Sequence, residues 1–123
     1  MLAYRHAFHA ANHGDVLKHL VLSEVLRHMG EKDKAYTLID THAGAGGYSL
    51  QGRYAQQRAE YLDGVARLWE APEGLPEAVR RYLDLVREFN GGPGAELHQY
   101  PGSPAIAQAL LRPHDALRLF ELH

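Results

Sequence analysis

The sequence contains no cysteine among its 123 residues. This excludes a disulfide framework and any metal site built on thiolates. The chain also lacks an apolar run near the roughly 20 residues that a membrane-spanning helix needs. Its first residues include Arg5, His6 and His9 and do not form the apolar core of a signal peptide. We therefore expect a cytoplasmic protein without membrane association.

An excess of basic charge is missing as well. The 13 lysines and arginines face 15 aspartates and glutamates, and the formal net charge is −2. Any contact with nucleic acid must therefore come from a local patch. Hydrophobic residues make up 46% of the chain, which is enough for the core of one domain. A chain this short buries only about two-thirds of its unfolded surface.

The spacing of apolar residues predicts helices in an α/β domain. Asp15 is expected to cap the first helix, which ends before Gly30. Ser103 is expected to cap the last helix, whose first residue is Pro104. The central helices end at the glycine-rich segment 90–94. The expected helical ranges are 15–29, 61–69, 79–89 and 105–111.

Two apolar runs, 35–39 and 116–120, predict strands, and the segment 96–100 is expected to be extended. The first strand leads into the segment Asp40–Tyr48, which combines an acid with several glycines. Glycine lets the backbone approach a ligand, and α/β domains bind nucleotides at the carboxyl ends of their strands. No Gly-Lys-Ser/Thr sequence follows, which argues against a phosphate loop.

A dinucleotide site would need an acid about 20 residues further on, at the end of the next strand. Glu60 is near that distance but lies in a segment that we expect to be helical. If a helical hairpin is inserted after the first strand, the corresponding acid is Glu121. A carboxylate there could accept hydrogen bonds from both ribose hydroxyls. The alternative is a solvated glutamate at a strand end.

Five segments, taken in order, resemble one family: Tyr4–Ala10, Asp15–His19, Asp40–Gly46, Tyr100–Pro104 and Glu121–His123. They are similar to the N-terminal half of the RlmJ family, bacterial S-adenosylmethionine-dependent methyltransferases that modify adenine N6 in 23S ribosomal RNA. The resemblance implies the N-terminal part of a class I, Rossmann-like methyltransferase fold. Its core would comprise residues 1–53 and 96–123, and residues 54–95 would form an inserted helical subdomain.

The resemblance also implies contacts to the cofactor S-adenosylmethionine. Glu121 would bind the ribose, and the backbone of Gly44 and Gly46 would pass close to the methionine part. His42 stands where other class I methyltransferases have glycine. Without the resemblance, solvated histidines and a helix-capping serine would be adequate explanations. The implied cofactor residues are His19, His42, Gly44, Gly46, Ser103 and Glu121.

The implied substrate is 23S ribosomal RNA. Tyr4 would lie beside the target base, where an aromatic ring can stack on a flipped adenine. Arg5, His6 and Lys18, together with two further histidines, would form a cationic patch against phosphate. The alternative is a polar N-terminus exposed to solvent.

A metal site is a further possibility in this segment, since His9 and His13 are four residues apart, with His6 and Asp15 nearby. A helix that begins only at Asp15 would break this spacing. We therefore expect no metal.

The chain contains no Asp-Pro-Pro-Tyr sequence. By resemblance to adenine-N6 methyltransferases, this motif holds the exocyclic amine, whose lone pair is conjugated with the ring and must be oriented toward the methyl group. We expect no catalytic residue here, and an inactive chain that is a fragment or a truncated product. Two other functions stay open: a noncatalytic RNA-interaction module and a different nucleotide-binding α/β protein.

Overall fold

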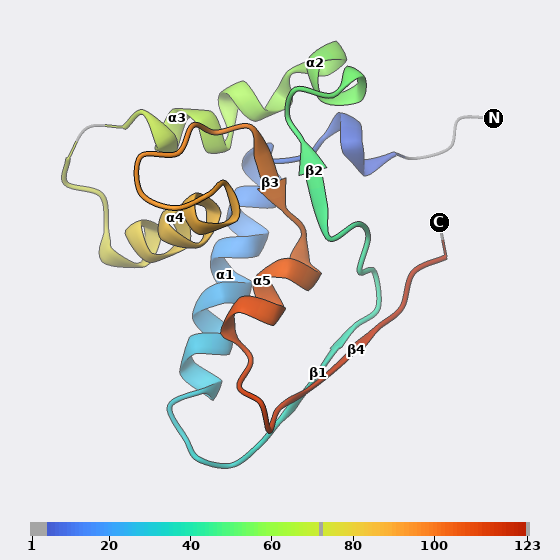
Figure 1. Ribbon diagram of the computed structural model, residues 1–123, viewed down its shortest axis with the longest axis vertical. Coiled ribbons are helices and arrows are strands. Elements are labelled where there is room, and N and C mark those ends of the chain that lie inside the picture. The colour runs from blue at the N-terminus through green and yellow to red at the C-terminus, as the bar shows by residue number, and fades with distance from the viewer. Residues whose placement is uncertain (1–4, 72, 123) are drawn as a thin grey trace.

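The computed structural model describes residues 5–71 and 73–122 and has a mixed α/β architecture (Figure 1). Strands β1 (Thr37–Asp40) and β4 (Ala116–Leu119) pair in parallel, with Asp40 opposite Leu119. The long helix α1 (His13–Met29) contacts α5 (Ser103–Leu110), and α5 also contacts β1. Both strands predicted from the apolar runs are therefore confirmed, and they pair in parallel.

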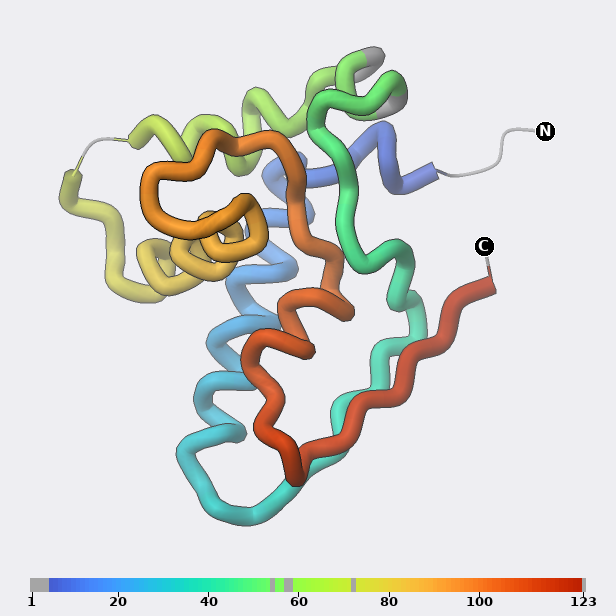
Figure 2. The backbone as a smooth tube through the Cα atoms, viewed as in Figure 1, coloured from blue at the N-terminus to red at the C-terminus, as the bar shows by residue number. Residues whose placement is uncertain are grey.

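A helical segment is inserted between two further strands. Strand β2 (Gly47–Ser49) is antiparallel to β3 (Gln99–Pro101), so the chain returns beside the point where it left (Figure 2). The sequence did not predict β2, because three residues that include a glycine give no alternating apolar pattern. The remaining helices are η1 (His6–Phe8), α2 (Arg53–Arg58), η2 (Glu60–Asp63), α3 (Val65–Trp69) and α4 (Glu77–Phe89).

The inserted segment supplies much of the hydrophobic core. Helix α4 buries Tyr82, Leu83 and Val86 on one face, at the spacing that a helix requires. Tyr100 from β3 and Leu50 after β2 complete the same cluster. Burial of such side chains is the main favourable contribution to folding.

Both predicted helix caps are wrong. Helix α1 begins at His13, and the side chain of Asn12 accepts the hydrogen bond from the Asp15 amide at 2.9 Å. Asp15 is buried and accepts from the amide of Ala11, so its carboxylate is not available as a cap. Helix α5 begins at Ser103, whose hydroxyl makes no capping bond. The hydroxyl donates instead to the carboxylate of Asp40. Hydrogen bonds to charged groups are stronger than those between neutral groups.

The helix predicted over residues 61–69 is interrupted at Gly64. There the chain divides into η2 and α3, because the amide of Val65 bonds the carbonyl oxygen of Ala11. A Cβ on Gly64 would collide with that same carbonyl oxygen. The close contact ties the inserted helices to the start of α1.

Candidate functional site

A pocket of about 290 Å³ opens at the carboxyl ends of β1 and β4, where the glycine turn meets α1 and α5. This is the edge at which α/β sheets bind ligands. A neighbouring hollow of about 310 Å³ shares Lys18, His19, His42 and Ser103 with it. The residues lining the pocket are His6, Lys18, His19, His42, Ala43, Gly44, Tyr48, Gly102, Ser103 and Glu121.

The glycine turn forms one wall of the pocket. Gly44 has a φ of +64°, and a Cβ there would lie 2.8 Å from the Tyr48 hydroxyl. That hydroxyl accepts a hydrogen bond from the Ala45 amide at 3.2 Å. A Cβ on Gly102 would collide with the Ala45 carbonyl oxygen. The turn therefore requires glycine at two positions to pack against its neighbours.

Asp40 holds the turn to the start of α5. Its Oδ2 accepts a hydrogen bond from the Ser103 hydroxyl at 2.5 Å, and its Oδ1 accepts from the His42 amide at 3.2 Å. The imidazole of His42 lies 2.9 Å from the Thr41 hydroxyl, measured at Nδ1. Sequence reasoning noted Asp40 before the glycines but gave it no role, since a strand-end acid alone does not identify its partner.

His19 lies at the back of the pocket with only 3% of its surface exposed. Burial lowers the pKa of His19 from 6.5 to about 4, although the nearby carboxylate of Asp15 acts to raise it. The ring is therefore neutral at pH 7 and carries a single N–H. A neutral imidazole provides one donor and one acceptor.

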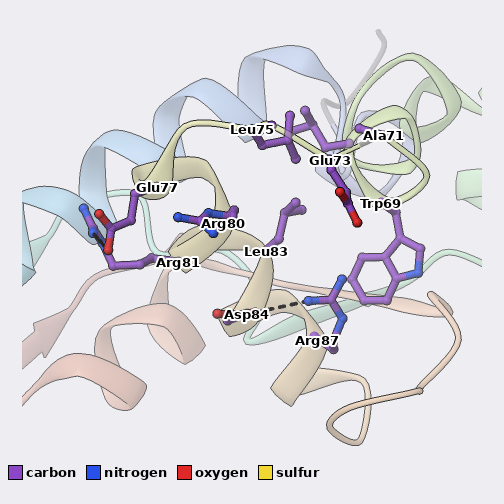
Figure 3. A pocket seen from close by; sticks show the side chains of 12 residues that line it. Trp69, Ala71, Glu73, Leu75, Glu77, Arg80, Arg81, Leu83, Asp84 and Arg87 are labelled. Atoms are coloured by element: carbon purple, nitrogen blue, oxygen red, sulfur yellow. Dashed lines mark hydrogen bonds and ion pairs between the residues drawn. The ribbon is translucent and has the colours of Figure 1, made fainter.

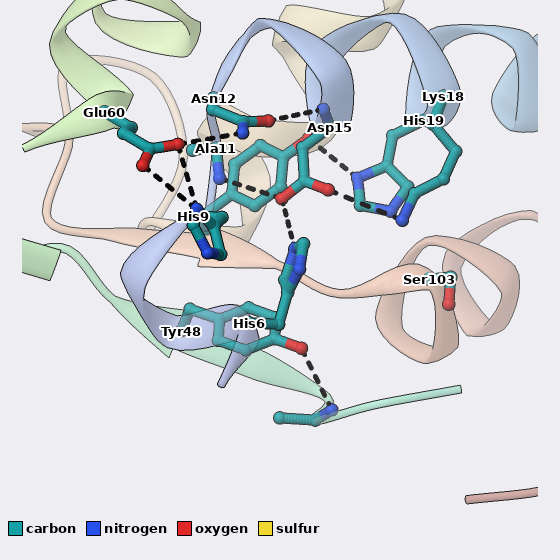
Figure 4. A network of polar contacts seen from close by, with 12 residues as sticks. His6, His9, Ala11, Asn12, Asp15, Lys18, His19, Tyr48, Glu60 and Ser103 are labelled. Carbon is teal, nitrogen blue, oxygen red and sulfur yellow. Dashed lines mark hydrogen bonds and ion pairs between the residues drawn. The ribbon is translucent and has the colours of Figure 1, made fainter. Parts of the chain in front are cut away.

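A polar network surrounds Asp15 beside the pocket (Figure 4). Its buried carboxylate lies 2.6 Å from His6 Nε2, and Lys18 Nζ is 3.4 Å away. Burial acts to raise the pKa of Asp15, but the His6 contacts and the Ala11 amide outweigh this and lower it. Asp15 is therefore an anion at neutral pH and supplies negative charge to the predicted cationic patch.

His9 and Asn12 anchor the N-terminal segment to the insertion. His9 Nδ1 lies 3.0 Å from a carboxylate oxygen of Glu60, and the Asn12 amide donates to Glu60 at 3.1 Å. Glu60 thus has a structural role. Within residues 5–71 and 73–122, no three histidine or acidic side chains gather as metal ligands would.

The pocket brings together five of the six predicted cofactor residues, and Gly46 is outside its lining. Glu121 lies at the pocket, and its Oε1 accepts from the Leu122 amide at 2.9 Å. Of the predicted RNA residues, His6 and Lys18 line the same pocket. Arg5 is exposed just before η1, and Tyr4 falls outside the described residues.

Sequence reasoning missed several residues of this wall. Tyr48 closes the glycine turn, and Gly102 provides the close approach between the turn and α5. The signals were present, since Tyr48 follows the glycines directly and Gly102 precedes Ser103. Neither could be interpreted without knowing that β2 and β3 pair.

A larger hollow of about 580 Å³ lies in the insertion, lined by parts of α3 and α4 (Figure 3). The guanidinium of Arg87 stands 4.8 Å from the centre of the Trp69 ring and bonds Asp84 at 3.1 Å. Arg81 forms ion pairs with Glu24 and Glu77. Three acidic side chains, Glu73, Glu77 and Asp84, line the hollow beside its three arginines, so it is not a basic surface.

In the described part of the chain, no helix combines the length and apolarity required to cross a membrane.

A family model and two related proteins all indicate ribosomal RNA large subunit methyltransferases. The family model described as "Ribosomal RNA large subunit methyltransferase D, RlmJ" matches residues 33–123. Ribosomal RNA large subunit methyltransferase J of Escherichia coli (strain K12) is 50% identical over 123 residues, which are 100% of this chain and 43% of that protein. The protein of the same name from Haemophilus influenzae (strain ATCC 51907 / DSM 11121 / KW20 / Rd) is 46% identical over the same shares.

A solved structure from Legionella pneumophila str. Philadelphia 1, assigned to the DUF519 family, superimposes with a TM-score of 0.82. The two sequences are 36% identical, and the match covers 93% of this chain and 40% of the Legionella chain. The chain thus spans less than half the length of the relatives it matches.

Proposed function

The chain belongs to the RlmJ family of ribosomal RNA large subunit methyltransferases, and we propose that it forms the cofactor-binding part of an enzyme that methylates adenine N6 in 23S ribosomal RNA. The observation that carries this proposal is the pocket at the carboxyl ends of β1 and β4, lined by five residues that the family resemblance implies. Because the proposed substrate is bacterial ribosomal RNA, we propose that the protein acts in the cytoplasm.

The parallel pairing of β1 with β4 supports a class I, Rossmann-like core built from residues 1–53 and 96–123. The helices between β2 and β3 support an inserted subdomain at residues 54–95. The insertion begins and ends at neighbouring strands, so it leaves the parallel pair undisturbed.

The lining of the pocket fits S-adenosylmethionine. Glu121 provides a carboxylate for the ribose hydroxyls, and Gly44 presents backbone without a side chain. Neutral His19 and the imidazole of His42 offer hydrogen bonds to polar groups of the methionine part. The two hollows, of about 290 and 310 Å³, share four residues and together fall within the range of small-molecule sites.

When bound, S-adenosylmethionine supplies an electrophilic methyl group. The residues of this chain bind and orient the donor. Asp40 and Ser103 hold the glycine turn against α5, which keeps Gly44 in place. His6 and Lys18 line the same pocket and, with Arg5 and Tyr4, are proposed to meet the RNA. Methyl donor and target base would then approach one another across a short distance.

The acceptor amine has no catalytic carboxylate within residues 1–123, since no Asp-Pro-Pro-Tyr sequence occurs there. We therefore propose that the 123-residue chain binds cofactor but transfers no methyl group by itself. Incubation of the chain with labelled S-adenosylmethionine and deproteinised ribosomal RNA should give no incorporation. Incorporation would reveal a catalytic group that is not in the motif.

Isothermal titration calorimetry tests the cofactor assignment. S-adenosylmethionine should bind and NAD should not, as membership of the methyltransferase family implies. Glu121 alone does not separate the two cofactors, because a strand-end acid can meet the ribose of either. Equal binding of NAD would favour a different nucleotide-binding protein. Binding of ribosomal RNA fragments without binding of either cofactor would favour a noncatalytic RNA-interaction module, the alternative suggested by the missing motif.

A further inference from the structure

Behind the pocket, His19 is hydrogen-bonded to a pair of tyrosines that none of the assignments above uses. His19 Nδ1 is 2.7 Å from the hydroxyl of Tyr100, and that hydroxyl is 2.6 Å from the hydroxyl of Tyr82. Both tyrosines are fully buried, and His19 is 3% exposed. These hydrogen bonds run from α4 of the insertion through β3 to α1, so they connect the insertion with the pocket.

The burial of the Tyr82 hydroxyl determines the direction of these hydrogen bonds. Tyr82 has no other hydrogen-bond partner for its hydroxyl among the described residues. If Tyr82 donates to Tyr100, then Tyr100 donates to His19 Nδ1, and both hydroxyl hydrogens are bonded. In the reverse direction the Tyr82 hydrogen would be buried without an acceptor, which is costly.

The protonation states agree with the first direction. Burial raises the pKa of both tyrosine hydroxyls, so each keeps its hydrogen. Burial lowers the pKa of His19 to about 4, so the ring carries one hydrogen near pH 7. If Nδ1 accepts from Tyr100, that hydrogen must be on Nε2.

The orientation of the ring is fixed by stacking. The rings of His19 and Tyr100 have centroids 5.5 Å apart and planes 28° apart. His19 lines the pocket, and no hydrogen bond from the described residues reaches its Nε2. The charged or titratable side chains that act on the pKa of His19 are Asp15, Lys18, His6 and Asp40.

We propose that Tyr82 and Tyr100 are positioning residues that hold His19 in the Nε2–H tautomer and present this N–H to an acceptor atom of the bound cofactor. The contact between His19 and the cofactor rests on the proposed function. The tautomer itself is a property of the protein alone. Tyr82, which belongs to the insertion, acts through Tyr100 by donating to its hydroxyl.

Nitrogen-15 NMR of the imidazole rings tests the tautomer in the absence of ligand. In the parent protein, His19 should show a protonated Nε2 and an unprotonated Nδ1. Tyr100→Phe removes the hydroxyl that donates to Nδ1 and keeps an aromatic ring beside His19, so Nδ1 loses the donor that held it unprotonated. This variant should show a mixture of both tautomers.

Tyr36→Phe is the control, because the Tyr36 hydroxyl is buried without a hydrogen-bond partner in the described part of the chain. Its His19 signals should equal those of the parent. Calorimetry should show S-adenosylmethionine affinity several-fold lower for Tyr100→Phe and unchanged for Tyr36→Phe. Melting temperatures of both variants report whether the fold is preserved.

Two results would overturn the proposal: a parent His19 protonated on Nδ1, or a Tyr100→Phe variant that keeps a single Nε2–H tautomer and parental affinity. The first of these needs no variant and decides the question even if Tyr100→Phe fails to fold. A parent that binds no S-adenosylmethionine would overturn the proposed function and the cofactor contact, while the NMR signals would still decide the tautomer.

Discussion

The insertion and the parallel strand pair differ in how completely they bury their apolar side chains. Tyr82 and Val86 of α4 are 0% exposed, whereas Ile39 at β1 and Phe120 after β4 are 57% and 56% exposed. In Figure 1 the strand pair forms an edge of the molecule that α5 contacts on one side. Helices complete a core from nearby sequence, but parallel strands depend on coverage of both faces.

The outer face of α1 repeats this contrast. Val16 and Leu20 pack against the core, while Leu17, Val21 and Val25 are 64%, 53% and 52% exposed. The apolar side chains of α1 are therefore packed on the side that meets the insertion and exposed on the opposite side. Stability should be concentrated in the insertion and its contacts, and weakest around the strand pair.

The largest expected effect tests this contrast directly. Leu83→Ala removes a side chain that is 4% exposed and should lower the free energy of unfolding by about 2–5 kcal/mol. Ile39→Ala removes an apolar side chain that is 57% exposed and should cost less than about 1 kcal/mol. Urea denaturation of both variants measures the difference. Equal costs would mean that the strand face is covered in solution.

The second prediction concerns acid sensitivity at the pocket. Folded His19 stays neutral down to a pKa of about 4, whereas in the unfolded chain its pKa is 6.5. Between these values the unfolded chain binds a proton that the folded chain does not, so stability falls as the pH falls. The interval corresponds to about 3 kcal/mol. Asp15, whose pKa is lowered, loses its contribution only below its ordinary 3.8.

Urea denaturation at a series of pH values from 7 to 4 checks this. The curve for His19→Gln should be flatter than that of the parent, because glutamine does not titrate. The exposed His114 provides a control, and His114→Gln should keep the parental slope. Parallel curves for parent and His19→Gln would show that the pKa of His19 is the same in the folded and the unfolded chain.

The third prediction moves to the mouth of the pocket. Glu121→Ala should weaken S-adenosylmethionine binding by about ten- to a hundredfold, since hydrogen bonds to a charged group contribute about 1.5–3 kcal/mol. The exposed Glu31, in the turn after α1, serves as the control. Calorimetry on both variants measures the affinity. If Glu121→Ala binds like the parent, the ribose assignment is wrong.

The sequence predicted the parts of the fold that depend on local pattern. The strands β1 and β4 and the helix α4 follow from their apolar spacing, and Glu121 follows from the end of β4. Strand β2 was missed, because Gly47 becomes extended through pairing with Pro101, far along the chain. Nonlocal pairing of this kind leaves no periodic signal.

The errors at the site have the same cause. Ser103 looks like a cap because serine before proline starts many helices, yet Asp40 at the end of β1 takes its hydrogen bond. The hydrogen bonds that join Tyr82, Tyr100 and His19 were not predicted either. A tyrosine in an apolar stripe is ordinarily a core residue, and only the fold brings Tyr82 and Tyr100 to within 2.6 Å.

The smallest expected effect separates two glycines of one turn, both of which the resemblance implied as cofactor contacts. Gly44 has a φ of +64° and lines the pocket. Gly44→Ala should cost about 1–2 kcal/mol of stability from the left-handed backbone alone. Its Cβ would also approach the Tyr48 hydroxyl to 2.8 Å and stand 3.7 Å from Glu121 Oε2, so S-adenosylmethionine affinity should fall as well.

Gly46 is the comparison within the same turn, because no described atom outside its chain neighbours lies within 4 Å of where its Cβ would stand, and it is absent from the pocket lining. Gly46→Ala should therefore change neither the melting temperature nor the affinity. Thermal unfolding and calorimetry on the two variants measure both quantities. A loss of affinity in Gly46→Ala at an unchanged melting temperature would show that the bound cofactor reaches past Gly44, which would restore Gly46 as a contact and extend the site along the turn.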